Sequence, residues 1–352
     1  MVNQPRRWFV SLTLLLVGCG VTSQPPAEVA PTPAADAPKV VATSSVICDL
    51  TRQIAAERVH LTCLVPPGVD AHTYQPTPAN RQALETAQVV FYNGYDFEPQ
   101  VEKLIKAAPP SVLRVAVGEL AVPKPLMGTH DHAHGTTKAG DHGHDHGHDH
   151  GHDHGHGDKK AELVPDPHVF HTGANVANMA KVIGDKLAQV YPAQAQVFAK
   201  NTQTLVGELQ QLDTWMEQQF QTIPPKNRKL VTTHEALGYL AQAYGLQLTG
   251  ALQGISTQEQ PSASRLAALS KEIRQAQVPT IFAEVSVNPK LINTVAKEAG
   301  VKISEKPLFA DGLGAPGSGG ETVQKMLISN TCTIVDGLGG TCTPFNGNQT
   351  RS

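Results

Sequence analysis

The chain has 352 residues, a formal net charge of −3, 40% hydrophobic residues and 5% aromatic residues. This composition offers no basic field and no aromatic residues interleaved with basic ones, so it excludes a nucleic-acid partner. About 310 residues remain once an N-terminal signal segment and tether are set aside, which is enough for two domains of ordinary size.

The N-terminus has the features of an export signal. Arg6 and Arg7 precede an apolar core at residues 8–17, and residues 16–19 (Leu-Val-Gly-Cys) are similar to a lipobox. About ten apolar residues are too few to span a bilayer, so we expect residues 1–19 to be a lipoprotein signal segment that ends in a lipidated Cys19. An ordinary secretory signal with a chance cysteine is the alternative. The Pro- and Ala-rich residues 20–38 would form a flexible tether.

Strands and helices alternate along the chain from residue 40 onward. In the first half, apolar and β-branched runs predict strands at residues 40–46, 59–65, 89–93 and 112–115. Helical spacing in the same region predicts helices at residues 49–56 and 76–87. Farther along, the spacing predicts an amphipathic helix at 176–190 and, after Pro192, a second one that runs to about residue 220. At 1.5 Å per residue, the second helix would be about 40 Å long.

The alternation resumes after this long helix. It predicts strands at residues 229–233, 246–250, 280–283 and 302–304, and helices at residues 235–244, 262–275 and 289–299. We therefore predict an α/β fold with two lobes, each a parallel-type sheet flanked by helices. The expected lobes are residues 39–190 and 222–352, joined by one long linking helix at residues 191–221.

Residues 130–156 hold eleven of the sixteen histidines, interleaved with Asp and Gly. The segment has too little apolar surface to form a packed core, so we expect a disordered loop. Imidazoles suit zinc, copper or nickel, and tracts of this kind indicate metal binding. A solvated linker with a compositional bias is the alternative. The candidate auxiliary, weak metal ligands are His130, His132, His134, His142, His144, His146, His148, His150, His152, His154 and His156.

Four of the five cysteines remain after Cys19 is set aside, an even number that suits an oxidising compartment. None of them has a C-x-x-C spacing, so a cysteine zinc cluster is not expected. Of the three possible pairings we favour Cys48 with Cys63 and Cys332 with Cys342, because each pair closes a short loop.

Polar residues next to the predicted strands form a candidate metal site. His72, His234 and Asp311 follow strands, and His168 precedes a helix. In open α/β sheets, ligands bind at the carboxyl ends of the strands, and three imidazoles with one carboxylate suit tetrahedral zinc. Taken singly, each histidine would more often be a cap or a surface residue. Water in place of Asp311, or no fourth protein ligand, is an alternative for the last position.

Other residues near these four have secondary roles to consider. His171 lies three residues after His168 and would share its face in a helix, so it competes as the ligand. Asp70, Asp166 and Glu235 are candidates to orient the imidazoles through their second nitrogens, with helix capping as the alternative. The sequence has no H-E-x-x-H, no G-x-S-x-G and no phosphate-binding glycine loop, so we expect no enzymatic activity.

At these residues the chain resembles the metal-specific solute-binding lipoproteins that feed ABC importers (cluster A-I), and within them the zinc-uptake branch. The resemblance covers about residues 40–334. It depends on the motifs Gly-Val-Asp-Ala-His-Thr-Tyr-Gln-Pro-Thr-Pro at 68–78, Asp-Pro-His-Val-Phe at 166–170 and Thr-His-Glu-Ala-Leu-Gly-Tyr at 233–239. Phe170 departs from the family, in which tryptophan is common.

The resemblance implies a metal site between two lobes, with ligands at His72, His168, His234 and Asp311. It also implies capture of Zn²⁺ as the transported substrate and delivery to an ABC-type permease by a lipid-anchored, monomeric protein. The expected location is the periplasmic or extracytoplasmic face of the cell membrane. Manganese-binding relatives have a carboxylate where this chain has His234, which favours zinc. A manganese-binding member of the family, or a periplasmic zinc buffer or adhesin, is the alternative.

Overall fold

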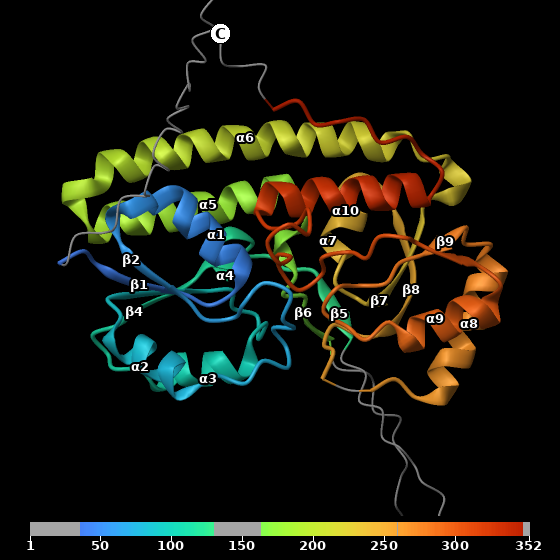
Figure 1. Ribbon diagram of the computed structural model, residues 1–352, viewed down its shortest axis with the longest axis horizontal. Coiled ribbons are helices and arrows are strands. Elements are labelled where there is room, and N and C mark those ends of the chain that lie inside the picture. Colours follow the sequence, from blue (N-terminus) through green and yellow to red (C-terminus); the bar gives the residue numbers. More distant parts are fainter. Residues whose placement is uncertain (1–35, 130–162, 259, 348–352) are drawn as a thin grey trace, which may run out of the picture. The chain divides into compact units, whose positions relative to one another are not determined.

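The computed structural model describes residues 36–129, 163–258 and 260–347 (Figure 1). The signal segment, Cys19 and the histidine-rich residues 130–156 lie outside these ranges. Among the described residues, no helix combines the length and the apolar character needed to cross a membrane.

The first lobe contains a four-stranded parallel sheet in the order β2-β1-β3-β4. Its strands are β1 (Lys39–Ala42), β2 (His60–Cys63), β3 (Val89–Tyr92) and β4 (Leu113–Ala116). Alternate side chains point to opposite faces of a strand, so Val40 and Phe91 pack on one face and Val41 and Val90 on the other. The helices of this lobe are α1 (Ser45–Ala55), α2 (Pro78–Thr86), α3 (Pro99–Ala107), α4 (Val117–Ala121) and α5 (Gly173–Val190), with the short 3₁₀ helices η1 (Ala56–Arg58) and η2 (Val169–His171).

The second lobe also contains parallel strands, arranged as two pairs. Parallel pairs form between β7 (Lys229–His234) and β8 (Gln247–Gln253), and between β9 (Thr280–Ile281) and β10 (Lys302–Ile303). The two pairs adjoin, because the N–H of Phe282 donates to the carbonyl of Val231 at 3.0 Å. The lobe begins with the short 3₁₀ helix η4 (Pro225–Asn227), which precedes β7. Its α-helices are α7 (Gly238–Tyr244), α8 (Ala263–Ala276), α9 (Lys290–Ala299) and α10 (Val323–Gly337).

A long helix connects the lobes, as predicted. After η3 (Pro192–Gln194), α6 (Ala195–Gln221) runs along α5 and α10, and it also contacts α1 and α7 (Figure 1). Gly184 lets α5 and α6 approach closely, because a Cβ at this position would clash with Thr202. The helix therefore packs on elements of both lobes and is not an isolated connector.

One buried apolar cluster, here called the central core, draws on both lobes. Its members include Val40 and Phe91 of the first sheet, Leu230 of β7, Phe282 directly after β9, Leu209 and Phe220 of α6, and Leu327 of α10. Two smaller clusters lie on the opposite faces of the sheets, one beneath α2 and α3 and one beneath α8 and α9. The two lobes thus share a single continuous interior along α6.

Several element boundaries differ from the prediction for local reasons. The strand predicted at residues 40–46 ends at Ala42, because the Ser44 side chain accepts the N–H of Ile47 and caps α1. The helix predicted from residue 235 begins only at Gly238. Helices α3, α4 and α10 were not predicted, nor was the antiparallel pair β5 (Met127–Thr129) and β6 (Leu163–Pro165).

The four described cysteines form two disulfides, in the pairing favoured from the sequence. Cys48 of α1 is bonded to Cys63 at the end of β2, and Cys332 of α10 is bonded to Cys342 in the C-terminal segment. Each bond closes a short loop, with sequence separations of 15 and 10 residues. The first bond thus ties a helix to the sheet, and the second ties the C-terminal segment to α10.

Candidate metal centre

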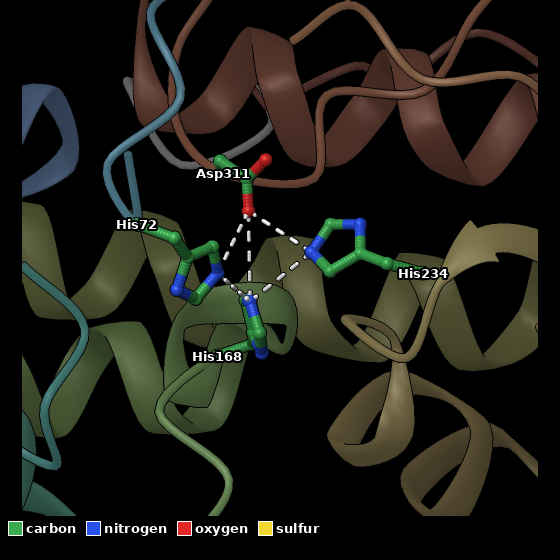
Figure 2. Close-up of side chains that lie close together, drawn as sticks. All are labelled: His72, His168, His234 and Asp311. Atoms are coloured by element: carbon green, nitrogen blue, oxygen red, sulfur yellow. Dashed lines mark hydrogen bonds and ion pairs between the residues drawn. The ribbon is translucent and has the colours of Figure 1, made fainter. Parts of the chain in front are cut away.

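Four side chains from separate parts of the chain converge on one point (Figure 2). His72 lies on the loop between β2 and α2, and His168 directly precedes η2. His234 is the last residue of β7, and Asp311 lies on the loop between β10 and α10. The structure therefore brings together all four residues that the sequence singled out, two from each lobe.

Each of the four residues offers one donor atom to the common point. The Nε2 atom of His168 lies 3.0 Å from Nε2 of His72 and 3.3 Å from Nε2 of His234. Asp311 Oδ1 lies 3.4, 3.5 and 3.0 Å from the Nε2 atoms of His72, His168 and His234, respectively. All four residues are buried, with exposed fractions of 3% or less. Donor atoms this close and this shielded from water can enclose a single metal ion.

Two carboxylates set the orientation of two imidazoles. Asp166 Oδ1 lies 2.8 Å from His168 Nδ1, and Glu284 Oε2 lies 2.5 Å from His234 Nδ1. A carboxylate accepts the Nδ1 proton, so the Nε2 atom of each ring is directed to the common point. Asp166 thus has the orienting role considered for it from the sequence.

Glu284 was not among the residues considered for an orienting role from the sequence, which were Asp70, Asp166 and Glu235. One oxygen of Glu284 also accepts the backbone N–H groups of Thr233 and His234, at 3.0 and 3.1 Å. The signal was available in the sequence, because Glu284 closely follows a predicted strand, as His234 follows another. The rule that placed His234 at a strand end therefore applies equally to Glu284.

The loop of His72 is held by the opposite lobe. Asp70 accepts the backbone N–H of His72 at 2.9 Å and the hydroxyl of Thr257 at 2.6 Å, so it fixes the turn and not the imidazole. The side chain of Gln258 donates to the carbonyl of His72 at 2.8 Å. These contacts join the loop that carries the first candidate ligand to the segment after β8.

Asp311 is fixed through one oxygen only. Ser286 donates its hydroxyl to Oδ2 at 2.5 Å, whereas Oδ1 has no partner with the geometry of a hydrogen bond among the described residues. A buried carboxylate oxygen without a hydrogen bond is costly, and a cation satisfies it. Oδ1 points to the three Nε2 atoms, which is where a bound cation would lie.

The buried charges interact strongly. Burial would lower the pKa of His234, but the carboxylates of Glu284 and Asp311 outweigh it and hold this pKa well above its usual value. Burial would likewise raise the pKa of Asp311, but His234 and the other imidazoles hold it well below its usual value. The pKa of His72 is lowered, mainly by burial. The two carboxylates thus favour the protonated form of His234 at the point where a cation would bind.

His171 does not join the donor group. Its Nε2 lies 2.8 Å from the carbonyl oxygen of Ala310, and its side chain is fully buried. Burial lowers the pKa of His171 to about 4, so the ring is neutral. The structure thus places His168, and not the alternative His171, with the other three candidate donors.

A cavity of about 620 Å³ lies beside the centre. Of the four donors, only His72 lines it, together with acidic residues that include Asp96 and Glu119. Phe97 packs edge-to-face against the His72 ring at a centroid distance of 5.2 Å and also packs on His168. The cavity therefore adjoins the donor group at His72.

Known proteins that resemble this chain bind metal ions. Residues 40–337 match a family model described as ZnuA, zinc-uptake complex component A, periplasmic. The manganese-binding lipoprotein MntA of Halalkalibacterium halodurans is 26% identical over 328 residues, which cover 93% of this chain and 95% of MntA. The zinc-binding protein TroA of Treponema pallidum is 30% identical over 306 residues, covering 86% of this chain and 89% of TroA.

The fold also matches solved structures. The structure of the periplasmic zinc-binding protein TroA of Treponema pallidum aligns with a TM-score of 0.73 and 29% identity, covering 86% of this chain and 99% of that one. It supports the reading of two α/β lobes joined by a long helix.

Proposed function

The chain belongs to the family of periplasmic zinc-uptake complex component A proteins, and on that premise we propose that it captures Zn²⁺ outside the cytoplasm and delivers it to an ABC-type membrane permease. As a member of this family it is a metal-binding, substrate-binding component of an ABC transporter, and not an enzyme. The proposal adds the identity of the ion, the residues that hold it and the way the protein is anchored.

The geometry of the donor atoms carries the proposal that the ion is zinc. Zinc bonds of about 2.0–2.2 Å place the corners of a coordination tetrahedron about 3.3–3.6 Å apart. Five of the six separations among the four donors are 3.0–3.5 Å. A site of three imidazoles and one carboxylate also suits zinc, whereas manganese favours oxygen donors. We assign His72, His168, His234 and Asp311 as the ligands.

Delivery follows from the proposed location. Lipid on Cys19 would hold the monomeric protein at the membrane surface, beside the permease that accepts the ion. Because the central core joins both lobes along α6, release would come from movement of the loops that carry His72 and Asp311 and not from a wide opening of the lobes.

Metal competition tests the identity of the ion. The purified mature protein, titrated with zinc and manganese against a chelator, is expected to bind one zinc ion tightly and to prefer zinc over manganese by at least about a hundredfold, the effect of two to three kcal/mol. Equal affinity, or a preference for manganese, would favour the alternative function suggested by the similarity to MntA.

Cellular uptake separates transport from zinc storage or attachment. In cells that lack the protein, accumulation of radioactive zinc at low external zinc is expected to fall and to be restored by the wild-type protein but not by His168→Ala. Unchanged uptake would instead support a buffer or an adhesin.

Deleting residues 130–156 is expected to remove weak zinc sites and to leave one tight site of nearly unchanged affinity. The reason is that all four proposed ligands lie outside the deleted segment, and a loop that must be ordered by each ion binds it less tightly. Calorimetry on the deletion variant measures both classes of site. The matched control keeps the length of the segment and replaces its eleven histidines by serine. Loss of the tight site in both variants would contradict the assignment of the four ligands.

A further inference from the structure

The loop that carries Asp311 is anchored on one side by its own lobe. The side-chain amide of Asn330, on α10, accepts the N–H of Phe309 at 2.9 Å and donates to the carbonyl of Phe309 at 2.8 Å. Ser286 donates to Asp311 Oδ2. These contacts fix the start of the loop and one carboxylate oxygen, but they leave the carbonyl of Ala310 to be satisfied from elsewhere.

The other lobe supplies that contact. His171 donates from Nε2 to the carbonyl of Ala310 at 2.8 Å, over a sequence separation of 139 residues. Ser45, at the start of α1, accepts the N–H of Leu313 at 2.9 Å. The peptide unit that leads into Asp311 is therefore held by a residue on η2, the short helix that His168 directly precedes.

The chemistry of His171 leaves no other role for its polar atoms. A carbonyl oxygen only accepts, so Nε2 carries the proton. Nδ1 is buried and has no hydrogen-bond partner among the described residues. An apolar side chain of similar size would pack against Phe170, whose ring lies 4.7 Å away, without burying an unpaired nitrogen. What the imidazole adds to this position is the hydrogen bond to Ala310.

We infer that His171 is a positioning residue that holds Asp311 Oδ1 at the metal site by fixing the Ala310 carbonyl to η2, the helix that His168 directly precedes. This inference rests on the proposed function, because it assigns a role at the same zinc site. Through this contact the second and the fourth ligand are set relative to one another, although they belong to different lobes. Loss of the contact would remove the bond between η2 and the residue that precedes Asp311, leave the loop held by contacts such as those of Asn330, Ser286 and Ser45, and speed the release of zinc.

A matched pair of substitutions isolates the hydrogen bond. His171→Leu keeps an apolar side chain of similar bulk and removes the donor, whereas His171→Gln retains an N–H donor near the position of Nε2. We expect His171→Leu to weaken zinc binding about tenfold, as loss of an orienting group does, and to raise the rate of release to a chelator. His171→Gln is expected to restore most of the affinity.

A double-substitution cycle tests whether His171 acts through Asp311. If it does, adding His171→Leu to Asp311→Ala causes no further loss of zinc affinity, because the group being positioned is already absent. Circular dichroism of the metal-free variants accompanies each titration and reports whether they are folded.

The outcomes separate the two proposals. Three results would overturn the positioning role. The first is a zinc affinity and release rate in His171→Leu equal to those of the wild type, and the second is a loss of zinc affinity in His171→Gln as large as that in His171→Leu. The third is a loss of affinity in the double variant equal to the product of the two single losses. Wild-type protein without tight zinc binding, or unchanged affinity in Asp311→Ala, would instead refute the proposed ligand set.

Discussion

Alanine in place of His72, His168 or His234 is expected to weaken tight zinc binding by more than about a hundredfold. Loss of a group that only orients a ligand costs about 10- to 100-fold, and loss of the ligand itself costs more. Each substitution also leaves Asp311 Oδ1 buried with one neighbouring donor fewer. Competitive titration against a chelator measures the effect.

His60→Ala is the control for these variants. His60 lies at the amino end of the edge strand β2 and is not among the four donors, so its variant is expected to bind zinc as the wild type does. A single ligand variant that kept wild-type affinity would remove that histidine from the site.

Zinc affinity is expected to fall about tenfold per pH unit for each proton that the metal displaces, as the pH is lowered from about 8 to 6. Zinc competes with a proton for Nε2 of His234, and the raised pKa of His234 favours the proton in this competition. Binding is therefore favoured at high pH and is opposed increasingly as the pH falls below the pKa of His234. Titrations at several pH values measure the slope, and calorimetry in buffers of different ionisation enthalpy counts the protons released.

Glu284→Gln is the matched variant for this pH dependence. It keeps the size of the side chain and removes the negative charge that helps to hold the pKa of His234 high. We expect weaker zinc binding overall, because the carboxylate also orients His234, and a smaller loss of affinity between pH 8 and 7. A slope identical to that of the wild type would show that Glu284 does not set the proton competition.

Strands with strong apolar patterns were predictable, and elements defined by caps or by tertiary contacts were not. The strand predicted at residues 89–93 matches β3, because this strand is buried in the sheet and its sequence is therefore a continuous apolar run. Helix α10 was missed, since it buries polar residues such as Asn330 and Thr331 and so lacks a clear apolar stripe. Asn330 is buried because it holds the Asp311 loop, a contact that the sequence does not reveal.

The residues of the candidate site also fall into those that could be predicted from the sequence and those that depend on tertiary contacts. His72, His234 and Asp311 could be located by their place after strands, and Glu284 could have been located by the same rule. His171 suggested a competing ligand, because its spacing from His168 is visible in the sequence. Its actual partner, Ala310, lies 139 residues away, and only the folded chain brings the two together.

The central core beneath both lobes has a consequence for the heat of binding. Its apolar side chains, from Val40 in the first sheet to Phe282 directly after β9, are already removed from water. Changes in heat capacity on binding mainly report apolar surface that becomes buried. An ion that enters a preformed polar centre above such an interior changes little of that surface, so its binding enthalpy should vary only slightly with temperature. In this respect the protein would bind the ion in a rigid, preformed site, without a closure of the two lobes that buries apolar surface.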